Sequence, residues 1–153
     1  MKIKKCSLDD ILDLQKIYRQ TFFETFSEQN SEENMRIFLD KAYSEEKLKS
    51  EIEDKESETF IAVENQKILG VLKINTGNAE TESGLENSLE IQRIYILKES
   101  KGLGIGTVFM NLAEKKAREL GVSFIWLGVW EKNFSAQKFY TDKGFRRFSE
   151  HAF

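Results

Sequence analysis

The sequence predicts an α+β fold, in which a mixed central β-sheet is flanked by helices on both faces. Three observations predict it. Helical segments separate a first strand from a run of three strands, the last strands alternate with helices, and both central strands are largely apolar. The chain has 153 residues, the usual length of one domain, so we expect a single domain over 1–153.

The N-terminal part is predicted to be a strand followed by helices. The strand is Met1–Cys6, and Ser7 with Asp10 then matches a helix-starting capping box. Further helices are expected after Ser31 and after Ser44. The apolar residues predicted to face inward from these helices are Ile11, Leu14, Tyr18, Phe22, Met35, Phe38, Leu39, Ala42, Leu48 and Ile52.

The middle of the chain predicts three strands. Thr59–Glu64 and Ile68–Asn75 flank the turn sequence Asn65-Gln66-Lys67 and so predict an antiparallel hairpin. A polar segment, 76–87, is expected to be a flexible loop. Ser88–Leu97 is then an apolar strand, which we expect at the centre of the sheet.

The C-terminal part alternates helix and strand. A helix over 105–120 is predicted to end at Gly121, and Val122–Val129 is predicted to be the second central strand. A short helix follows Asn133 and ends near Gly144, and Phe145–Glu150 starts another strand. The buried face of the longer helix is predicted to hold Ile105, Val108, Phe109, Leu112, Ala113, Ala117 and Leu120.

A glycine-rich loop joins the first central strand to the long helix, with glycines at alternate positions 102, 104 and 106. Such spacing lets the backbone pass close to a ligand. The N–H groups of the helix N-terminus then favour a pyrophosphate. A dinucleotide-binding fingerprint would need a glycine at position 107 or 109, where Thr107 and Phe109 stand. A phosphate-binding P-loop would need a lysine before Thr107, where Gly106 stands. The loop therefore favours neither NAD nor ATP. The alternative interpretation is an ordinary glycine-rich turn.

A second motif accompanies the loop. Lys101–Gly106 matches the pattern Gln/Arg-x-x-Gly-x-Gly/Ala except at its first position. Residues 133–145 match Asn-x-x-Ala-x-x-Phe-Tyr-x-x-x-Gly-Phe. Together the motifs resemble the GNAT superfamily of N-acetyltransferases. The strings at 21–26, 30–35, 89–96 and 125–133 further resemble bacterial PaiA-type spermidine/spermine N-acetyltransferases.

The resemblance implies acetyl-CoA, or coenzyme A, as the cofactor. The backbone N–H groups of the loop would hold its pyrophosphate, and the preceding strand would pair with its pantetheine arm. Asn133 matches the asparagine that binds this arm, and its alternative role is a plain helix N-cap. The cofactor-binding residues implied are Ile94, Tyr95, Ile96, Lys101, Gly102, Leu103, Gly104, Ile105, Gly106, Thr107 and Asn133.

Two side chains are candidates for proton transfer. Glu90 lies early in the central strand, where the superfamily often places the carboxylate that accepts the proton of the amine through water. Its alternative role is a salt bridge. Tyr140 matches the family position for the acid that protonates the leaving thiolate, and its alternative role is core packing. The oxyanion donor would be the N–H of Ile94 or a neighbour, if the strand is bulged there.

Three side chains are candidates for binding the substrate amine. Glu24 and Glu28 are four residues apart on one helical face and could together bind an ammonium group of a polyamine. The alternative interpretation is that they form a solvent-exposed acidic face. Trp130 lies at the end of a predicted central strand, where it would line the pocket near the thioester. Its alternative role is core packing.

Composition limits the other function classes. The net charge of −3 argues against a general nucleic-acid binder. One cysteine and one histidine leave no disulfide within the chain, no zinc cluster and no histidine-based triad, so we expect no metal. No apolar run approaches a membrane span or a signal peptide, which predicts a cytoplasmic protein without a membrane partner.

The sequence therefore predicts an acetyltransferase that acts on a small amine, spermidine or spermine, by direct attack in a ternary complex. A peptide or protein N-acetyltransferase and a non-catalytic coenzyme A-binding module are the alternatives. We also expect the chain to end before the last strand of the family, which would expose a sheet edge and favour a homodimer.

Overall fold

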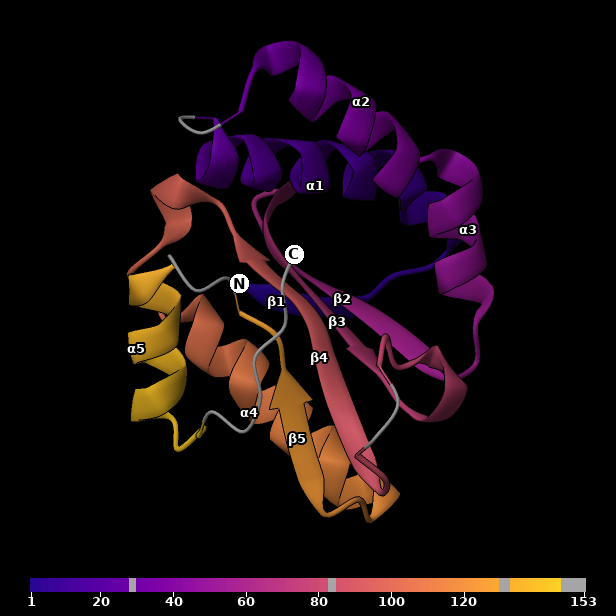
Figure 1. Ribbon diagram of the computed structural model, residues 1–153, viewed down its shortest axis with the longest axis vertical. Coiled ribbons are helices and arrows are strands. Elements are labelled where there is room, and N and C mark those ends of the chain that lie inside the picture. Colours follow the sequence, from indigo (N-terminus) through magenta and orange to yellow (C-terminus); the bar gives the residue numbers. More distant parts are fainter. Residues whose placement is uncertain (28–29, 83–84, 130–132, 147–153) are drawn as a thin grey trace.

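The described residues form one five-stranded mixed sheet, shown in Figure 1. The computed structural model describes residues 1–27, 30–82, 85–129 and 133–146. The strands lie in chain order, with β1 to β4 antiparallel and β4 parallel to β5. Their bounds are β1 Lys2–Lys5, β2 Ser57–Glu64, β3 Lys67–Asn75, β4 Ser88–Ile96 and β5 Phe124–Leu127.

Helices cover both faces of this sheet (Figure 1). One face carries α1 Ile11–Phe26, α2 Glu32–Ala42 and α3 Glu45–Glu53. The other carries α4 Ile105–Leu120 and α5 Phe134–Asp142. Short 3-10 turns occupy Leu8–Asp10, Gly77–Ala79 and Lys98–Ser100. The predicted fold class and the element order through α5 are thus confirmed.

Local sequence signals explain where the elements begin. Ser7 and Asp10 form the predicted capping box ahead of α1. The hydroxyl oxygens of Ser31 and Ser44 accept hydrogen bonds from backbone N–H groups in the first turns of α2 and α3. Between β2 and β3, Asn65 and Gln66 both have positive φ, as a two-residue hairpin turn requires.

The two faces of the sheet have separate cores. Alternate residues of β2, β3 and β4 pack against α4, and the remaining alternate residues pack against α1, α2 and α3. The core on the α4 side is almost entirely apolar. The core on the α1–α3 side includes the stacked rings of Tyr18 and Tyr43, whose centroids are 4.6 Å apart, and several buried polar groups.

An extra residue in β4 sets the orientation of the following side chains. Lys73 of β3 pairs with Arg93, whereas the next residue, Ile74, pairs with Ile91, so Gln92 is inserted as a β-bulge. Without this insertion Arg93 would face α4. With it, Arg93 points toward α1 and α3, and Ile94 packs in the core on the α4 side. The bulge lies two residues before Ile94, the residue whose N–H was expected to be freed only if the strand is bulged there.

Arg93 ties β4 to α3 through a buried ion pair. Its guanidinium donates two hydrogen bonds to the Glu51 carboxylate, at 2.7 and 2.8 Å. The same group lies over the rings of Tyr18 and Tyr43, with Cζ 4.9 and 5.2 Å from the ring centroids. This carboxylate raises the pKa of Arg93 although burial acts in the opposite direction, so the buried guanidinium stays charged and paired.

Several predicted core positions are wrong. Phe38, Val108 and Leu120 are exposed, at 49%, 36% and 57%. Met35 and Leu39 occupy the inner face of α2, and Phe38 instead stacks on Phe22. The buried stripe of α4 is narrower than the sequence pattern and includes Met110.

Element lengths differ slightly from the prediction. The strand β5 is shorter than predicted, and 76–82 is a loop that hydrogen bonds attach to the rest of the fold. The predicted strand at Phe145–Glu150 lies largely outside the described residues.

The ion pair gives a stability prediction. Replacing Glu51 with Ala leaves the Arg93 charge buried without its partner, so we expect a loss of about 3–5 kcal/mol in the free energy of unfolding. The matched control is Glu46→Ala on the exposed face of the same helix, expected to change it by no more than about 0.5 kcal/mol. Urea unfolding of both variants measures the difference, and equal losses would show that the pair contributes nothing.

Candidate functional site

The glycine loop has the geometry of an anion-binding turn. Gly102 and Gly104 have φ of 86° and 83°, a region that side-chain-bearing residues seldom adopt. A Cβ atom at either position would meet no heavy atom within 4 Å, so the backbone here is open to a ligand. Gly104 is the N-cap of α4, where no side chain caps the helix and no acidic residue stands in the first turn. The N–H groups of that first turn therefore remain available to an anion.

Gly106 has a different role from the other two glycines. A Cβ atom there would lie 3.2 Å from Cζ of Phe139 and 3.4 Å from Cδ1 of Ile96. The missing side chain thus lets α5 and the end of β4 pack closely against the first turn of α4. The sequence predicted Gly106 to be a cofactor contact. The structure shows that it also has a packing role.

The strand before the loop has an edge for which the described residues supply no strand partner. β4 and β5 pair from Ser88–Phe124 to Ile91–Leu127. Beyond that point, within the part of the chain that the structure describes, β4 pairs with β3 alone as far as Ile96. The backbone groups on the other edge of 92–96, which include Ile94, Tyr95 and Ile96, can accept an extended amide chain as an additional strand. This edge leads directly into Lys101 and the glycine loop.

Asn133 and Tyr140 are brought to the same side of the sheet by α5. The Asn133 Oδ1 accepts from the Ala136 N–H at 3.2 Å, so the predicted cap is present. Its side-chain NH₂ is the part that could bind a ligand carbonyl. Tyr140 packs against Phe139 and Phe145 beside α4, and burial raises the pKa of its phenol. The phenol therefore stays protonated at neutral pH.

Glu90 is buried, at 3% exposed, on the opposite face of the sheet. Its Oε1 accepts from the Asn75 amide at 2.9 Å and from the Thr81 backbone N–H at 2.8 Å, while its Oε2 accepts from the Thr81 hydroxyl. No salt bridge to Glu90 is found among the described residues. The loop 76–82 covers this carboxylate, and the exposed Thr81 links it to the surface.

Asn75 connects Glu90 to further buried polar groups that the sequence interpretation missed. Its Oδ1 accepts from the Ser57 hydroxyl at 2.8 Å and from the Lys73 amine at 2.7 Å. Its Nδ2 also donates to Gln92 Oε1 at 2.9 Å, and Lys73 donates to that same oxygen. Burial lowers the pKa of Lys73 to about 8. The polar network thus contains a lysine whose pKa is closer to neutral pH than that of an exposed lysine.

The sequence did carry signals for these residues. Lys73 and Asn75 alternate with apolar residues in the second half of β3, where every residue is buried. The consecutive polar residues Gln92 and Arg93 interrupt the alternation of β4, which is the pattern that a bulge produces.

The predicted substrate-binding residues are only partly described. Glu28 and Trp130 lie outside the described residues. Glu24 is exposed at the end of α1, and its Oε1 accepts from the Lys98 backbone N–H at 3.0 Å. It therefore contacts the segment between β4 and the glycine loop. A different carboxylate, Glu80, lies beside β4 and β5, and accepts from Trp126 Nε1 at 2.8 Å and from Ser88 Oγ at 2.7 Å.

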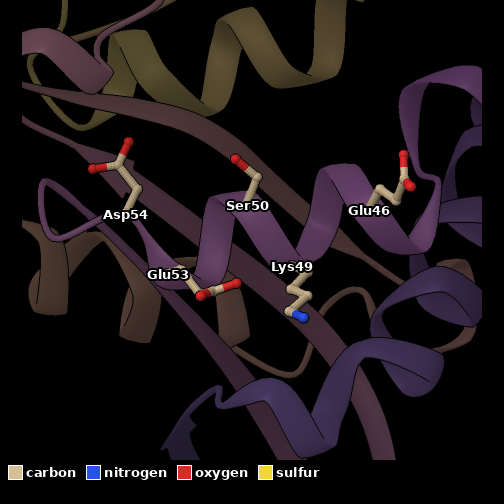
Figure 2. Close-up of a pocket in the computed structure, with 5 residues that line it drawn as sticks. All are labelled: Glu46, Lys49, Ser50, Glu53 and Asp54. Carbon is tan, nitrogen blue, oxygen red and sulfur yellow. The ribbon is translucent and has the colours of Figure 1, made fainter.

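Two hollows lie away from the glycine loop. One, beside the start of β4, is lined in part by Glu80, Glu82 and Glu86. The other lies on the outer face of α3 (Figure 2), where the side chains of Glu46, Lys49, Ser50, Glu53 and Asp54 are spread along the helix. Across the four described ranges, no cluster of His, Cys, Asp and Glu suits a metal ion. No helix in those ranges is long and apolar enough to span a membrane.

Comparison with known proteins gives consistent relatives. Residues 11–145 match the model of the Acetyltransferase (GNAT) family. An uncharacterised N-acetyltransferase encoded in the pepI 3′ region of Lactobacillus delbrueckii subsp. lactis is 40% identical over 153 residues, covering 100% of this chain and 88% of that protein. The spermidine N(1)-acetyltransferase of Thermoplasma acidophilum is 26% identical, over 95% of this chain and 88% of its own length.

Solved structures agree with this result. The crystal structure of the PaiA N-acetyltransferase from Thermoplasma acidophilum in complex with coenzyme A matches with a TM-score of 0.82 and 25% identity, covering 95% of this chain and 89% of that one. An aminoglycoside 6′-N-acetyltransferase from Acinetobacter haemolyticus has the same fold, with a TM-score of 0.74 at 14% identity. The family match covers most of the chain, including both motifs, and the protein belongs to the GNAT family of acetyltransferases.

Proposed function

We propose that this protein transfers the acetyl group of acetyl-CoA to a primary amine of a small polyamine, spermidine or spermine, by direct attack in a ternary complex. As a GNAT-family acetyltransferase it uses acetyl-CoA, which supplies an activated thioester. The observation that carries the proposal is that three features suited to coenzyme A follow one another along the chain. The edge of β4 at 92–96, which has no strand partner within the described part of the chain, runs into the glycine loop and then into the uncapped N-terminus of α4.

Different residues of this segment are suited to different parts of the cofactor. The backbone N–H groups from Leu103 to Thr107 suit a pyrophosphate, and Lys101 adds a positive charge at the start of the loop. The backbone at 94–96 and the NH₂ group of Asn133 suit the amides of the pantetheine arm.

The acceptor amine must lose its proton before it attacks. For an aliphatic amine with a pKa near 10.4, deprotonation at pH 7 costs about 4–5 kcal/mol. Glu90 is our candidate for the base. Because it is covered, the proton reaches it through the exposed Thr81 hydroxyl, which already donates to Glu90, or through water. The N–H of Ile94 or a neighbour, next to the bulge at Gln92, is our candidate for stabilising the oxyanion.

Tyr140 is our candidate for protonating the leaving thiolate. A donor of this kind must be protonated until the thiolate forms, and the partly buried phenol of Tyr140 meets this condition at neutral pH. Its position on α5, the helix that Asn133 caps, places it on the same element as the residue proposed to hold the pantetheine arm.

Acidic groups and one relative support a cationic acceptor. Glu80, Glu82 and Glu86 border the hollow beside the start of β4, and Glu24 adds a carboxylate near the glycine loop. The relative from Thermoplasma acidophilum that aligns over most of both chains is a spermidine N(1)-acetyltransferase. A soluble amine acceptor also agrees with our proposal that the protein works in the cytoplasm.

The first prediction concerns the acceptor. Thiol release from acetyl-CoA, followed with a chromogenic disulfide, should be fast with spermidine or spermine and slow with lysine-containing or N-terminal peptides. We expect kcat/KM to differ by roughly tenfold or more between the two classes, since a peptide does not present a second ammonium group on the same short alkyl chain. Faster release with peptides would favour a peptide acetyltransferase. Tight coenzyme A binding without release under any amine would favour a non-catalytic module.

A second prediction tests the glycine loop. Gly104→Ala places a Cβ on the ligand side at a backbone φ of 83°, so coenzyme A affinity should fall by roughly tenfold or more, a change of about 1.4 kcal/mol. Gly121→Ala is the matched control, because Gly121 caps the other end of α4 with a φ of 71° and equally open surroundings. Isothermal titration calorimetry should show near-normal affinity for the control, and equal affinities in the two variants would contradict the loop assignment.

A third prediction tests Tyr140. Tyr140→Phe keeps the ring contacts with Phe139 and Phe145 but removes the acid, so kcat should fall roughly ten- to a thousandfold with coenzyme A affinity nearly unchanged. Tyr43→Phe, which removes a buried hydroxyl from the opposite core, is the control. Unchanged turnover in Tyr140→Phe would remove this residue from the mechanism.

A further inference from the structure

The buried network around Asn75 contains opposite charges that do not touch each other. Lys73 and Glu90 project from neighbouring strands toward the same face of the sheet. Neither is paired directly with the other. Instead the Asn75 carboxamide lies between them, accepting from the Lys73 amine at 2.7 Å and donating to Glu90 at 2.9 Å. This arrangement is unusual, because a buried ammonium and a buried carboxylate normally form an ion pair.

The hydrogen bonds of Asn75 fix its orientation. Its Oδ1 accepts from Ser57 and Lys73, and its Nδ2 donates to Glu90 and Gln92. All four hydrogen-bonding positions of the amide are therefore used, and the side chain is fully buried. A rotation of the amide by 180° would present its oxygen to the Glu90 carboxylate and its NH₂ to the Lys73 amine, so the network permits one orientation.

Separating the Lys73 cation from Glu90 affects how well the carboxylate can act as a base. A cation in direct contact lowers the pKa of a carboxylate and makes it a weaker base. Lys73 has a pKa of about 8 and therefore carries charge on most molecules at pH 7. The other charged groups facing its amine are Glu51 and Asp54 from the α3 side and Arg93 with Glu90 on β4. Of these, Glu51 is already engaged by Arg93.

We propose that Asn75 is a positioning residue for acetyl transfer, whose carboxamide holds the Glu90 carboxylate and keeps the Lys73 amine from pairing with it. The inference rests on the proposed function, in which Glu90 accepts the proton of the substrate amine. Asn75 acts through Glu90, touching neither substrate nor cofactor, and it preserves the carboxylate as a proton acceptor.

Two substitutions of Asn75 should have opposite effects on the pH dependence of kcat. Asn75→Ala removes the separator, so Lys73 can approach Glu90 and lower its pKa. We expect kcat at pH 7 to fall roughly tenfold or more and the acidic limb of the profile to move to lower pH. The defect should shrink above pH 8, as Lys73 loses its proton. Asn75→Asp instead places a second carboxylate beside Glu90, which raises its pKa, so the limb should move to higher pH.

A double variant tests the cause directly. In Asn75→Ala/Lys73→Met the cation is absent, so kcat at pH 7 should recover several-fold relative to Asn75→Ala alone. A merely structural role for Asn75 predicts a further loss instead, since a second buried group is changed. Circular dichroism and coenzyme A titration of each variant establish that the fold and the cofactor site are intact. If Asn75→Ala does not fold, the isosteric Asn75→Asp profile decides the question alone.

The outcomes separate this inference from the proposed function. If the wild type releases no thiol with any amine, or if Glu90→Gln retains wild-type kcat, the proposed function or its base is wrong. If the wild type is active and Glu90→Gln is impaired, but neither Asn75 variant moves the acidic limb, the inference about Asn75 alone is overturned. The same holds if the double variant shows no recovery.

Discussion

The inserted residue in β4 is the constraint on which the rest of the structure depends. With Gln92 inserted, Arg93 turns toward α1 and α3 and reaches Glu51, while Ile94 and Ile96 turn toward α4. Pairing between β4 and β5 also ends beside this point, at Ile91. One irregularity in one strand therefore lies where the described β4–β5 pairing ends, upstream of the glycine loop, and directs a cation into the core on the other face.

The two faces of the sheet consequently do different jobs. The face toward α4 is apolar and carries the helix whose N-terminus begins at the glycine loop. The face toward α3 buries charged and amide side chains, which costs solvation free energy. That cost is offset where the groups satisfy one another, as in the bidentate pair of Arg93 with Glu51 and the four hydrogen bonds of Asn75. Apolar packing thus supports the side that carries the glycine loop, and polar packing supports the side that holds Glu90.

The sequence predicted those features that local interactions determine. Serines 31 and 44 cap helices because their hydroxyls reach N–H groups three residues on, and Gly121 ends α4 because its backbone is left-handed. These signals are complete within a few residues. The roles of Phe38 and Glu24 were harder to predict, because each depends on a partner from another element, Phe22 in one case and the Lys98 N–H in the other. The polar network was missed for the same reason, since its members come from β2, β3, β4 and the loop after β3.

The separate roles of the loop glycines agree with the family motif, whose last position accepts alanine while the glycine two positions earlier does not. At Gly106 a methyl group would press against the edge of the Phe139 ring at 3.2 Å, and a small displacement of that ring could accommodate it. At Gly104 space is available, but the backbone torsion itself disfavours any side chain. A side chain is thus compatible with this loop where a neighbour can yield and disfavoured where the main chain would have to change.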